Sequence, residues 1–144
     1  FFGRIANFIN GELWGRETTV PWAVVFRYDL TNPFTGEAET AFLLPRHPSQ
    51  LYAAAGEGLL ILLWTQLRFW KKEPLPHGQV LGEACLLYAA VRIADEFFRE
   101  PDIGVSAILG LTRGQFYSVL LALAGVAFIV AARRFSRRGN AGAE

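Results

Sequence analysis

The run from Gln115 to Ala132, QFYSVLLALAGVAFIVAA, decides the fold class because it contains no charged residue. A membrane-spanning helix takes roughly 20 mostly apolar residues. We therefore predict a membrane helix over about residues 114–133. A second apolar stretch predicts another membrane helix over about residues 48–70.

The stretch between these two is apolar but carries several charges. Residues 79–98 are long enough to span a bilayer, yet they include Arg92, Asp95 and Glu96. A charge at the bilayer centre costs about 2.5–3.5 kcal/mol, so such residues usually face a bundle interior or a water-filled cavity. We predict a third membrane helix whose charges line a functional cavity. The alternative is a set of structural ion pairs with a snorkelling Arg99.

The composition supports this class. Hydrophobic residues make up 52% of the 144 residues and charged residues 19%, below the soluble average of about 25%. We predict an all-α fold, a polytopic transmembrane helix bundle, with residues 1–15 as the end of a further helix. The chain has no Met, so we expect it to be part of a longer protein that residues 1–144 alone cannot replace in catalysis. The net charge of +1 gives no indication of a nucleic-acid partner.

Residues 16–47 contain only short apolar runs, and this pattern predicts an extra-membrane loop. Two short apolar runs, at 22–26 and 41–44, flank the turn signal Thr31–Gly36, which favours a hairpin. Basic residues follow the first and last spans, and such residues mark the cytoplasmic side. The loop is therefore predicted to be periplasmic and the tail at 134–144 cytoplasmic.

Polar residues recur at helical spacing in two places. Arg92, Glu96 and Arg99 are spaced i, i+4, i+7, and Arg4, Asn7 and Gly11 are spaced i, i+3, i+7, so each set predicts one polar face. We expect Arg4 and Arg92 to face one cavity from different helices. Glu57 lies in an apolar span, so we expect it to need a partner or a proton.

Four motifs occur in order. They read GRIANFINGELWG at Gly3–Gly15, RHPSQLY at Arg46–Tyr52, RIADEFFREPD at Arg92–Asp102 and GQFYS at Gly114–Ser118. Together they resemble the signatures of the prolipoprotein diacylglyceryl transferase family. The resemblance covers Phe1 to about Arg134 and corresponds to roughly the second half of a family member.

The resemblance implies a function and a place. The family transfers the sn-1,2-diacylglyceryl group of phosphatidylglycerol to the lipobox cysteine thiol of a preprolipoprotein and releases glycerol phosphate, the first step of bacterial lipoprotein maturation. It implies a multi-pass protein of the bacterial inner membrane whose active site faces the periplasm. The implied partners are phosphatidylglycerol, preprolipoprotein signal peptides with a lipobox cysteine, and membrane lipid, with no cofactor and no metal.

The same resemblance implies the site residues. The residues expected to be catalytic are Arg4, Asn7, Glu12, Gly15, Arg92, Glu96 and Arg99. Those expected to bind substrate are Arg4, Asn10, His47, Gln50 and Tyr52. Two arginines suit a lipid phosphate because the guanidinium stays charged and offers a bidentate fork. Glu12 and Glu96 are expected to orient these arginines.

There are two departures from the family pattern. Family members commonly have glutamate where this chain has Ala53, although Glu57 follows nearby. The family's histidine region and an essential tyrosine precede the matched part, so the base for the thiol stays unassigned. The alternatives are a membrane transporter, since charged membrane helices also line substrate pathways, and a non-catalytic lipid-binding scaffold.

Overall fold

The computed structural model of the chain describes residues 1–31, 36, 38–71, 75–100, 108 and 110–141. Most of these residues are helical, which confirms the helical class predicted from the sequence. The elements in chain order are α1 (Phe2–Ile9), β1 (Arg27–Thr31), β2 (Ala38–Phe42), α2 (Ser49–Ala53), η1 (Ala54–Leu60), α3 (Ile61–Phe69), α4 (Gln79–Asp95) and α5 (Arg113–Ala141).

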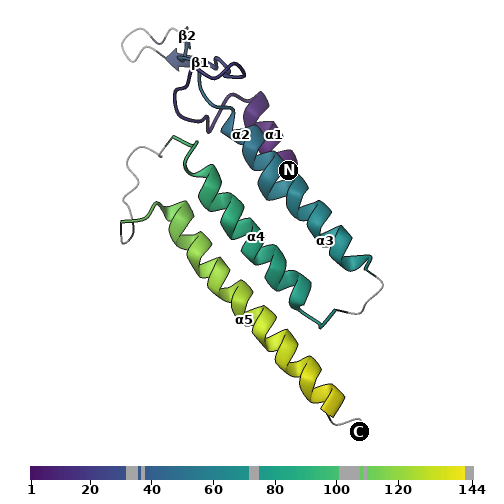
Figure 1. Cartoon of the computed structure of the whole chain (residues 1–144). Helices are drawn as coiled ribbons and strands as arrows, with labels where there is room; N and C mark the ends of the chain where they lie inside the picture. Colours follow the sequence, from purple (N-terminus) through teal and green to yellow (C-terminus); the bar gives the residue numbers. More distant parts are fainter. Residues whose placement is uncertain (32–35, 37, 72–74, 101–107, 109, 142–144) are drawn as a thin grey trace.

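Helices α2, η1 and α3 follow one another without a break and form one rod (Figure 1). Its bounds agree with the predicted helix over residues 48–70, and Pro48 stands just before the first helical residue. The segment η1 is π-helical, which the apolar pattern does not predict. A π-helical segment is rare and often occurs at a functional site.

Helix α1 is short, and a defined motif ends it. The amide of Glu12 donates to the carbonyl of Asn7 at 3.0 Å, and the amide of Gly11 donates to that of Phe8 at 3.1 Å. These two bonds form a Schellman motif, in which the residue after the cap is left-handed and usually glycine. Gly11 has φ 67°, so the predicted polar face through Gly11 is wrong beyond Ile9.

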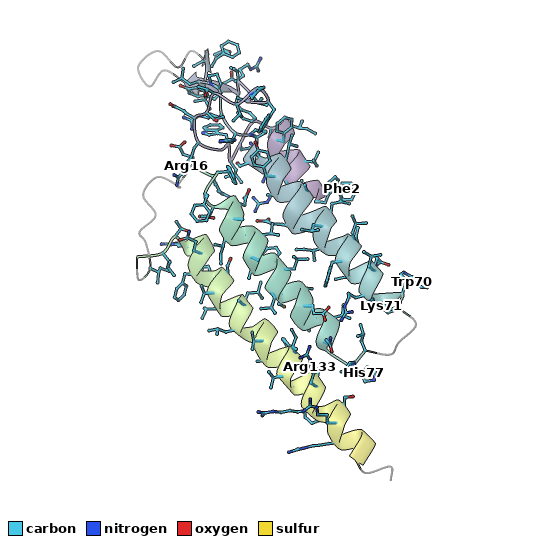
Figure 2. All side chains as sticks on the ribbon, viewed as in Figure 1. Phe2, Arg16, Trp70, Lys71, His77 and Arg133 are labelled. Atoms are coloured by element: carbon cyan, nitrogen blue, oxygen red, sulfur yellow. The ribbon has the colours of Figure 1, made fainter. Side chains whose placement is uncertain are left out.

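The rod, α4 and α5 lie side by side, with α4 antiparallel to both neighbours (Figure 1). Helix α4 ends at Asp95, three residues earlier than expected, and α5 continues to Ala141, eight residues beyond the predicted end. Trp70, Lys71, His77 and Arg133 gather at one end of the helices, and Arg16 lies at the other end (Figure 2).

A hairpin lies at the same end as Arg16. Strands β1 and β2 pair antiparallel, with Arg27 opposite Phe42 and Asp29 opposite Thr40. This confirms a hairpin within residues 16–47, although most of its predicted turn falls outside the described residues. The apolar run 22–26 precedes β1, and its last residue, Phe26, is buried against the rings of Trp14 and Phe8.

One helix in the described part of the chain, Arg113–Arg138, is long and apolar enough to cross a membrane. Only 17% of its most apolar 18-residue window is buried, so it is not the covered core helix of this fold. Large apolar side chains such as Leu63, Leu67 and Leu123 are exposed on the helices. A bundle with several membrane spans remains a prediction.

Candidate functional site

Two arginines from different helices meet at one carboxylate. Arg4 on α1 donates to Oε2 of Glu57 through Nε at 3.2 Å and Nη2 at 2.9 Å. Nη1 of Arg92 on α4 lies 3.5 Å from the other oxygen, Oε1 of Glu57. The side chain of Glu57 is 8% exposed, so both guanidinium groups neutralise a buried charge. This arrangement confirms the expectation that Glu57 needs a partner, and it brings Arg4 and Arg92 together from different helices. That the two arginines face one cavity stays a prediction.

Arg92 has two further acidic neighbours near the end of α4. Its Nη1 lies 3.5 Å from Oδ2 of Asp95, and its Nη2 lies 3.2 Å from Oε2 of Glu96. Removing one member of such a buried set leaves an uncompensated charge, which costs about 3–5 kcal/mol. We call Arg4, Glu57, Arg92, Asp95 and Glu96 the charged cluster. Within the described part of the chain, no group of three His, Cys, Asp or Glu side chains could hold a metal ion.

The π-helical segment η1 carries Glu57 near its middle. A π-helical turn closes with i→i+5 hydrogen bonds and is wider than an α-helical turn. It therefore changes the direction in which Glu57 leaves the rod, relative to a regular α-helix. We infer that η1 helps to aim this carboxylate between α1 and α4.

Gly15 fixes the loop above the cluster by close backbone contacts. Its amide donates to the carbonyl of His47 at 3.0 Å, and it forms a β-bridge with Arg99. A Cβ atom at this position would lie 2.6 Å from the carbonyl oxygens of His47 and Phe98. No side chain fits there, so this position needs glycine.

Two buried side chains hold the same loop. Arg46 donates from Nη1 to the carbonyl of Gly15 at 3.1 Å and also pairs with Glu100. Gln50 is 1% exposed and donates from Nε2 to the carbonyl of Glu12 at 2.7 Å. Gln50 was expected to bind substrate, and the structure shows its amide contacting the backbone of the loop.

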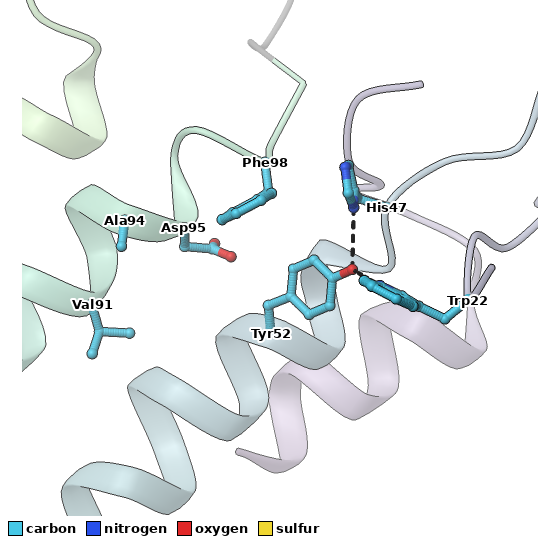
Figure 3. A pocket seen from close by; sticks show the side chains of 7 residues that line it. All are labelled: Trp22, His47, Tyr52, Val91, Ala94, Asp95 and Phe98. Atoms are coloured by element: carbon cyan, nitrogen blue, oxygen red, sulfur yellow. Dashed lines mark hydrogen bonds between the residues drawn. The ribbon is translucent and has the colours of Figure 1, made fainter. Parts of the chain in front are cut away.

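An aromatic pocket lies beside the cluster and has a volume of about 460 Å³. Trp22 Nε1 donates to the Tyr52 hydroxyl at 2.7 Å, and that oxygen lies 3.1 Å from Nδ1 of His47 (Figure 3). The ring of Phe98 packs edge-on against the rings of His47 and Tyr52. The pocket residues are Trp22, His47, Tyr52, Val91, Ala94, Asp95 and Phe98.

The structure separates the expected site residues into groups. Arg4, Arg92 and Glu96 belong to the charged cluster, while His47 and Tyr52 belong to the aromatic pocket. The remaining members lie in or near the loop that follows α1: Asn7, Asn10, Glu12, Gly15, Gln50 and Arg99.

Two expectations need correction. Arg99 does not continue the helical face of Arg92, because α4 ends at Asp95 and the chain then turns to bridge Gly15. Glu12 pairs with no arginine in the part of the chain that the structure describes, and its exposed carboxylate accepts a hydrogen bond from Nδ2 of Asn10 at 2.9 Å. Pro101 and Asp102 of the third motif lie outside the described residues.

Four residues complete the site besides those expected to be catalytic or to bind substrate. The charge pattern does single out Asp95, because a carboxylate in an apolar helix usually has a partner or faces a cavity. Trp22 gave no signal, since exposed loops commonly contain aromatic residues. Phe98 belongs to the third motif, but no role was expected for it. Gly114 of α5 packs on the cluster, where a Cβ would lie 2.6 Å from Oε2 of Glu96.

Comparisons with known proteins agree on one family. The family model described as prolipoprotein diacylglyceryl transferase matches residues 1–131. A protein of Cupriavidus necator named phosphatidylglycerol--prolipoprotein diacylglyceryl transferase is 47% identical over 98% of this chain and 47% of its own length. Proteins of the same name from Nitrosomonas europaea and Rhodospirillum rubrum are 45% and 48% identical over 92% and 93% of this chain, and 44% and 46% of their own lengths. The chain thus spans about half the length of these relatives. No solved structure matches it.

Proposed function

The chain belongs to the prolipoprotein diacylglyceryl transferase family, and from this premise we propose that the protein transfers the diacylglyceryl group of phosphatidylglycerol to a cysteine thiol. The acceptor is the lipobox cysteine of a preprolipoprotein signal peptide. The names of the relatives support both substrates, since they combine phosphatidylglycerol with prolipoprotein. The product is a thioether, and glycerol phosphate is released.

The observation that carries this proposal is the convergence of Arg4 and Arg92 on Glu57. Two guanidinium groups on different helices that share one carboxylate form a site for an oxyanion. Arginine stays charged and matches phosphate oxygens with its planar fork. In this proposal the lipid phosphate takes up hydrogen bonds that Glu57 makes in the absence of lipid.

The charge balance of the cluster agrees with such an exchange. Three carboxylates, Glu57, Asp95 and Glu96, lie around Arg4 and Arg92, so both guanidinium groups already have acidic partners in the absence of lipid. A phosphate therefore binds by displacing a carboxylate from an arginine. Glu57 is the member shared by both arginines, and for this reason we assign the exchange to it.

The reaction step follows from the same arrangement. The cysteine thiol, with an ordinary pKa near 8.5, loses its proton to a base and attacks as the thiolate. A carbon–sulfur bond forms at the diacylglyceryl carbon, and the carbon–oxygen bond to phosphate breaks. The electron pair goes to the phosphate oxygen, where Arg4 and Arg92 stabilise the growing charge in a poorly hydrated site.

The other family positions act around this centre in the proposal. Asn7, Asn10, Glu12, Gly15 and Arg99 shape the loop after α1, and Gln50 and His47 contact its backbone. Glu96 orients Arg92 from the next helical turn. Tyr52 contributes to the wall of the aromatic pocket. Their effect on transfer is to position the arginines and the lipid.

The proposed location is the bacterial inner membrane, with several spans and the cytoplasm at the C-terminal end. Support comes from α5, which is apolar and mostly uncovered, and from the basic residues at the end that Figure 2 marks by Lys71 and Arg133. Basic residues flank membrane spans on the cytoplasmic side. The charged cluster lies toward the opposite end, near the hairpin, and would open to the periplasm.

One assay tests the proposal against its alternatives. The full-length gene product is incubated with phosphatidylglycerol vesicles and a lipobox peptide, and released glycerol phosphate and the peptide thioether are measured together. Equal amounts of both products are expected, and a peptide with serine in place of the cysteine gives neither. Movement of lipid or solute without glycerol phosphate would instead support a transporter. Lipid binding without either product would support a scaffold.

A further inference from the structure

Asp95 has a carboxylate oxygen that no described residue satisfies. The side chain is 4% exposed, and its Oδ1 is buried without a hydrogen-bond partner among the described residues. Its Oδ2 lies 3.5 Å from Nη1 of Arg92. A buried acceptor left unsatisfied is costly, and such a group in a protein calls for an explanation.

The carboxylate lines the aromatic pocket. In Figure 3 it points from α4 into the space between Phe98 and Tyr52. The polar groups on the opposite wall are engaged with one another. Trp22 donates to the Tyr52 hydroxyl, and that hydroxyl shares a second hydrogen bond with Nδ1 of His47, whose direction depends on the His47 tautomer. The pocket thus presents one acceptor without a hydrogen-bond partner among the described residues, beside aromatic and apolar side chains.

We propose that this pocket binds the headgroup glycerol of phosphatidylglycerol, with a glycerol hydroxyl donating a hydrogen bond to Oδ1 of Asp95. The proposal rests on the proposed function and extends it to headgroup recognition. A phosphate held by Arg92 would stand next to the pocket, because Asp95 contacts Arg92 through its other oxygen. The headgroup glycerol is joined to that phosphate and carries uncharged hydroxyl donors.

The pocket suits such a ligand in size and in chemistry. A volume of about 460 Å³ falls within the range of roughly 300–1,000 Å³ usual for small-molecule sites. The rings of Trp22, Tyr52 and Phe98 offer apolar faces to the C–H groups of glycerol, while a few polar groups set the orientation of a ligand in such sites. Asp95 is then a specificity residue that distinguishes a hydroxyl-bearing headgroup from one without hydroxyls.

The test compares two lipids of equal charge. Phosphatidylglycerol and phosphatidylmethanol both carry one phosphodiester charge, but only the first has headgroup hydroxyls. Affinities for the full-length gene product are measured in detergent micelles by titration of each lipid, without acceptor peptide. The wild type is expected to prefer phosphatidylglycerol by about tenfold, as one hydrogen bond to a charged group allows. Phosphatidylethanolamine, whose headgroup is an ammonium, is expected to bind more weakly than phosphatidylglycerol.

The Asp95→Ala variant is expected to bring the ratio of the two affinities close to one. Loss of a negative charge raises the affinity for both anionic lipids alike, so the ratio isolates the hydroxyl contact. Asp95→Asn retains an acceptor oxygen and is expected to keep part of the preference. Glu57→Gln is the matched control, because it removes one charge from the same cluster and leaves the pocket unchanged. Asp29→Asn, on exposed β1, controls for a general change of charge.

Two results would overturn the proposal. The first is an unchanged ratio in Asp95→Ala, and the second is an equal loss of affinity for both lipids, which would indicate a structural role. Preferential binding of phosphatidylethanolamine would also contradict it, because Asp95 would then bind an ammonium group and not a hydroxyl. The headgroup preference is measured by lipid binding, so it can be measured even if the transferase assay shows no product. Failure of the proposed function and failure of the headgroup proposal can therefore be distinguished.

Discussion

Replacing Glu57 by glutamine should lower stability and raise the affinity for anionic lipid at the same time. The substitution keeps the shape of the side chain and one acceptor oxygen, but it removes the charge between Arg4 and Arg92. Without that charge the two guanidinium groups repel each other. An anionic phosphate would then meet a cluster with two carboxylates for two arginines.

The magnitudes follow from burial and distance. The side chains of Arg4, Arg92 and Glu57 are 22%, 16% and 8% exposed, so their ion pairs are not surface ion pairs. Removing one partner of a buried pair costs about 3–5 kcal/mol, and the retained oxygen of glutamine favours the lower value. At about 6 Å and an effective dielectric constant near 20, a unit charge repels a phosphate by roughly 3 kcal/mol. Solvent at the membrane surface reduces this repulsion, so we expect at least about a tenfold gain in affinity.

Thermal unfolding of the detergent-solubilised full-length protein and titration with phosphatidylmethanol measure the two effects. The unfolding midpoint should fall by about 6–12 °C, at roughly 2–4 °C per kcal/mol. Glu83→Gln provides a matched control, because Glu83 pairs with Arg68 at 2.6 Å with both side chains 17% exposed. It should lower stability in a similar way without changing lipid affinity. A weaker affinity for phosphatidylmethanol in Glu57→Gln would refute the idea that Glu57 and phosphate compete.

Three further predictions concern neighbouring positions. Lysine in place of Arg4 or Arg92 should lower kcat/KM for glycerol phosphate release at least about tenfold, because a point charge cannot replace the fork; near-normal rates in both variants would end the leaving-group role. Gly15→Ala should cost about 1–3 kcal/mol or more of unfolding free energy, since its Cβ would meet two carbonyl oxygens at 2.6 Å; an unchanged unfolding midpoint would contradict this. Ala53→Glu should lower the release rate, because Ala53 is 1% exposed and a new carboxylate there would be buried without a partner. A large gain in rate would show that the chain lacks a needed carboxylate.

The part of the fold that the sequence predicts best is the part that hydrophobicity controls. The uncharged run in α5 and the apolar rod around Leu60 are too long for strands, so their helical state follows from length. The convergence of Arg4 and Arg92 is predictable for a related reason. A charge in an apolar segment needs a partner, and Glu57 in the rod is the corresponding opposite charge.

Backbone geometry limits what the sequence predicts. The i+7 spacing of Arg99 from Arg92 indicates one face only if the helix continues, but α4 ends at Asp95. The π-helical segment around Glu57 leaves no trace in the apolar pattern, because its hydrogen-bond register depends on packing against α1 and α4. The direction of Tyr52, which joins it to Trp22, depends on a loop distant in sequence. No local pattern specifies such a contact.

In the proposed reaction, the carboxylates of the charged cluster also affect the release of product. As the carbon–oxygen bond breaks, the phosphate changes from a diester with one negative charge to a monoester with about −1.5 to −2 at pH 7. In the proposed mechanism Arg4 and Arg92 would therefore bind the departing group more tightly than the lipid, which favours the transition state. The same preference would retain glycerol phosphate in the site. Glu57 opposes this retention because it competes for both arginines through contacts that already exist without lipid. In this mechanism the same three side chains, Arg4, Arg92 and Glu57, would control both the rate of bond cleavage and the release of product.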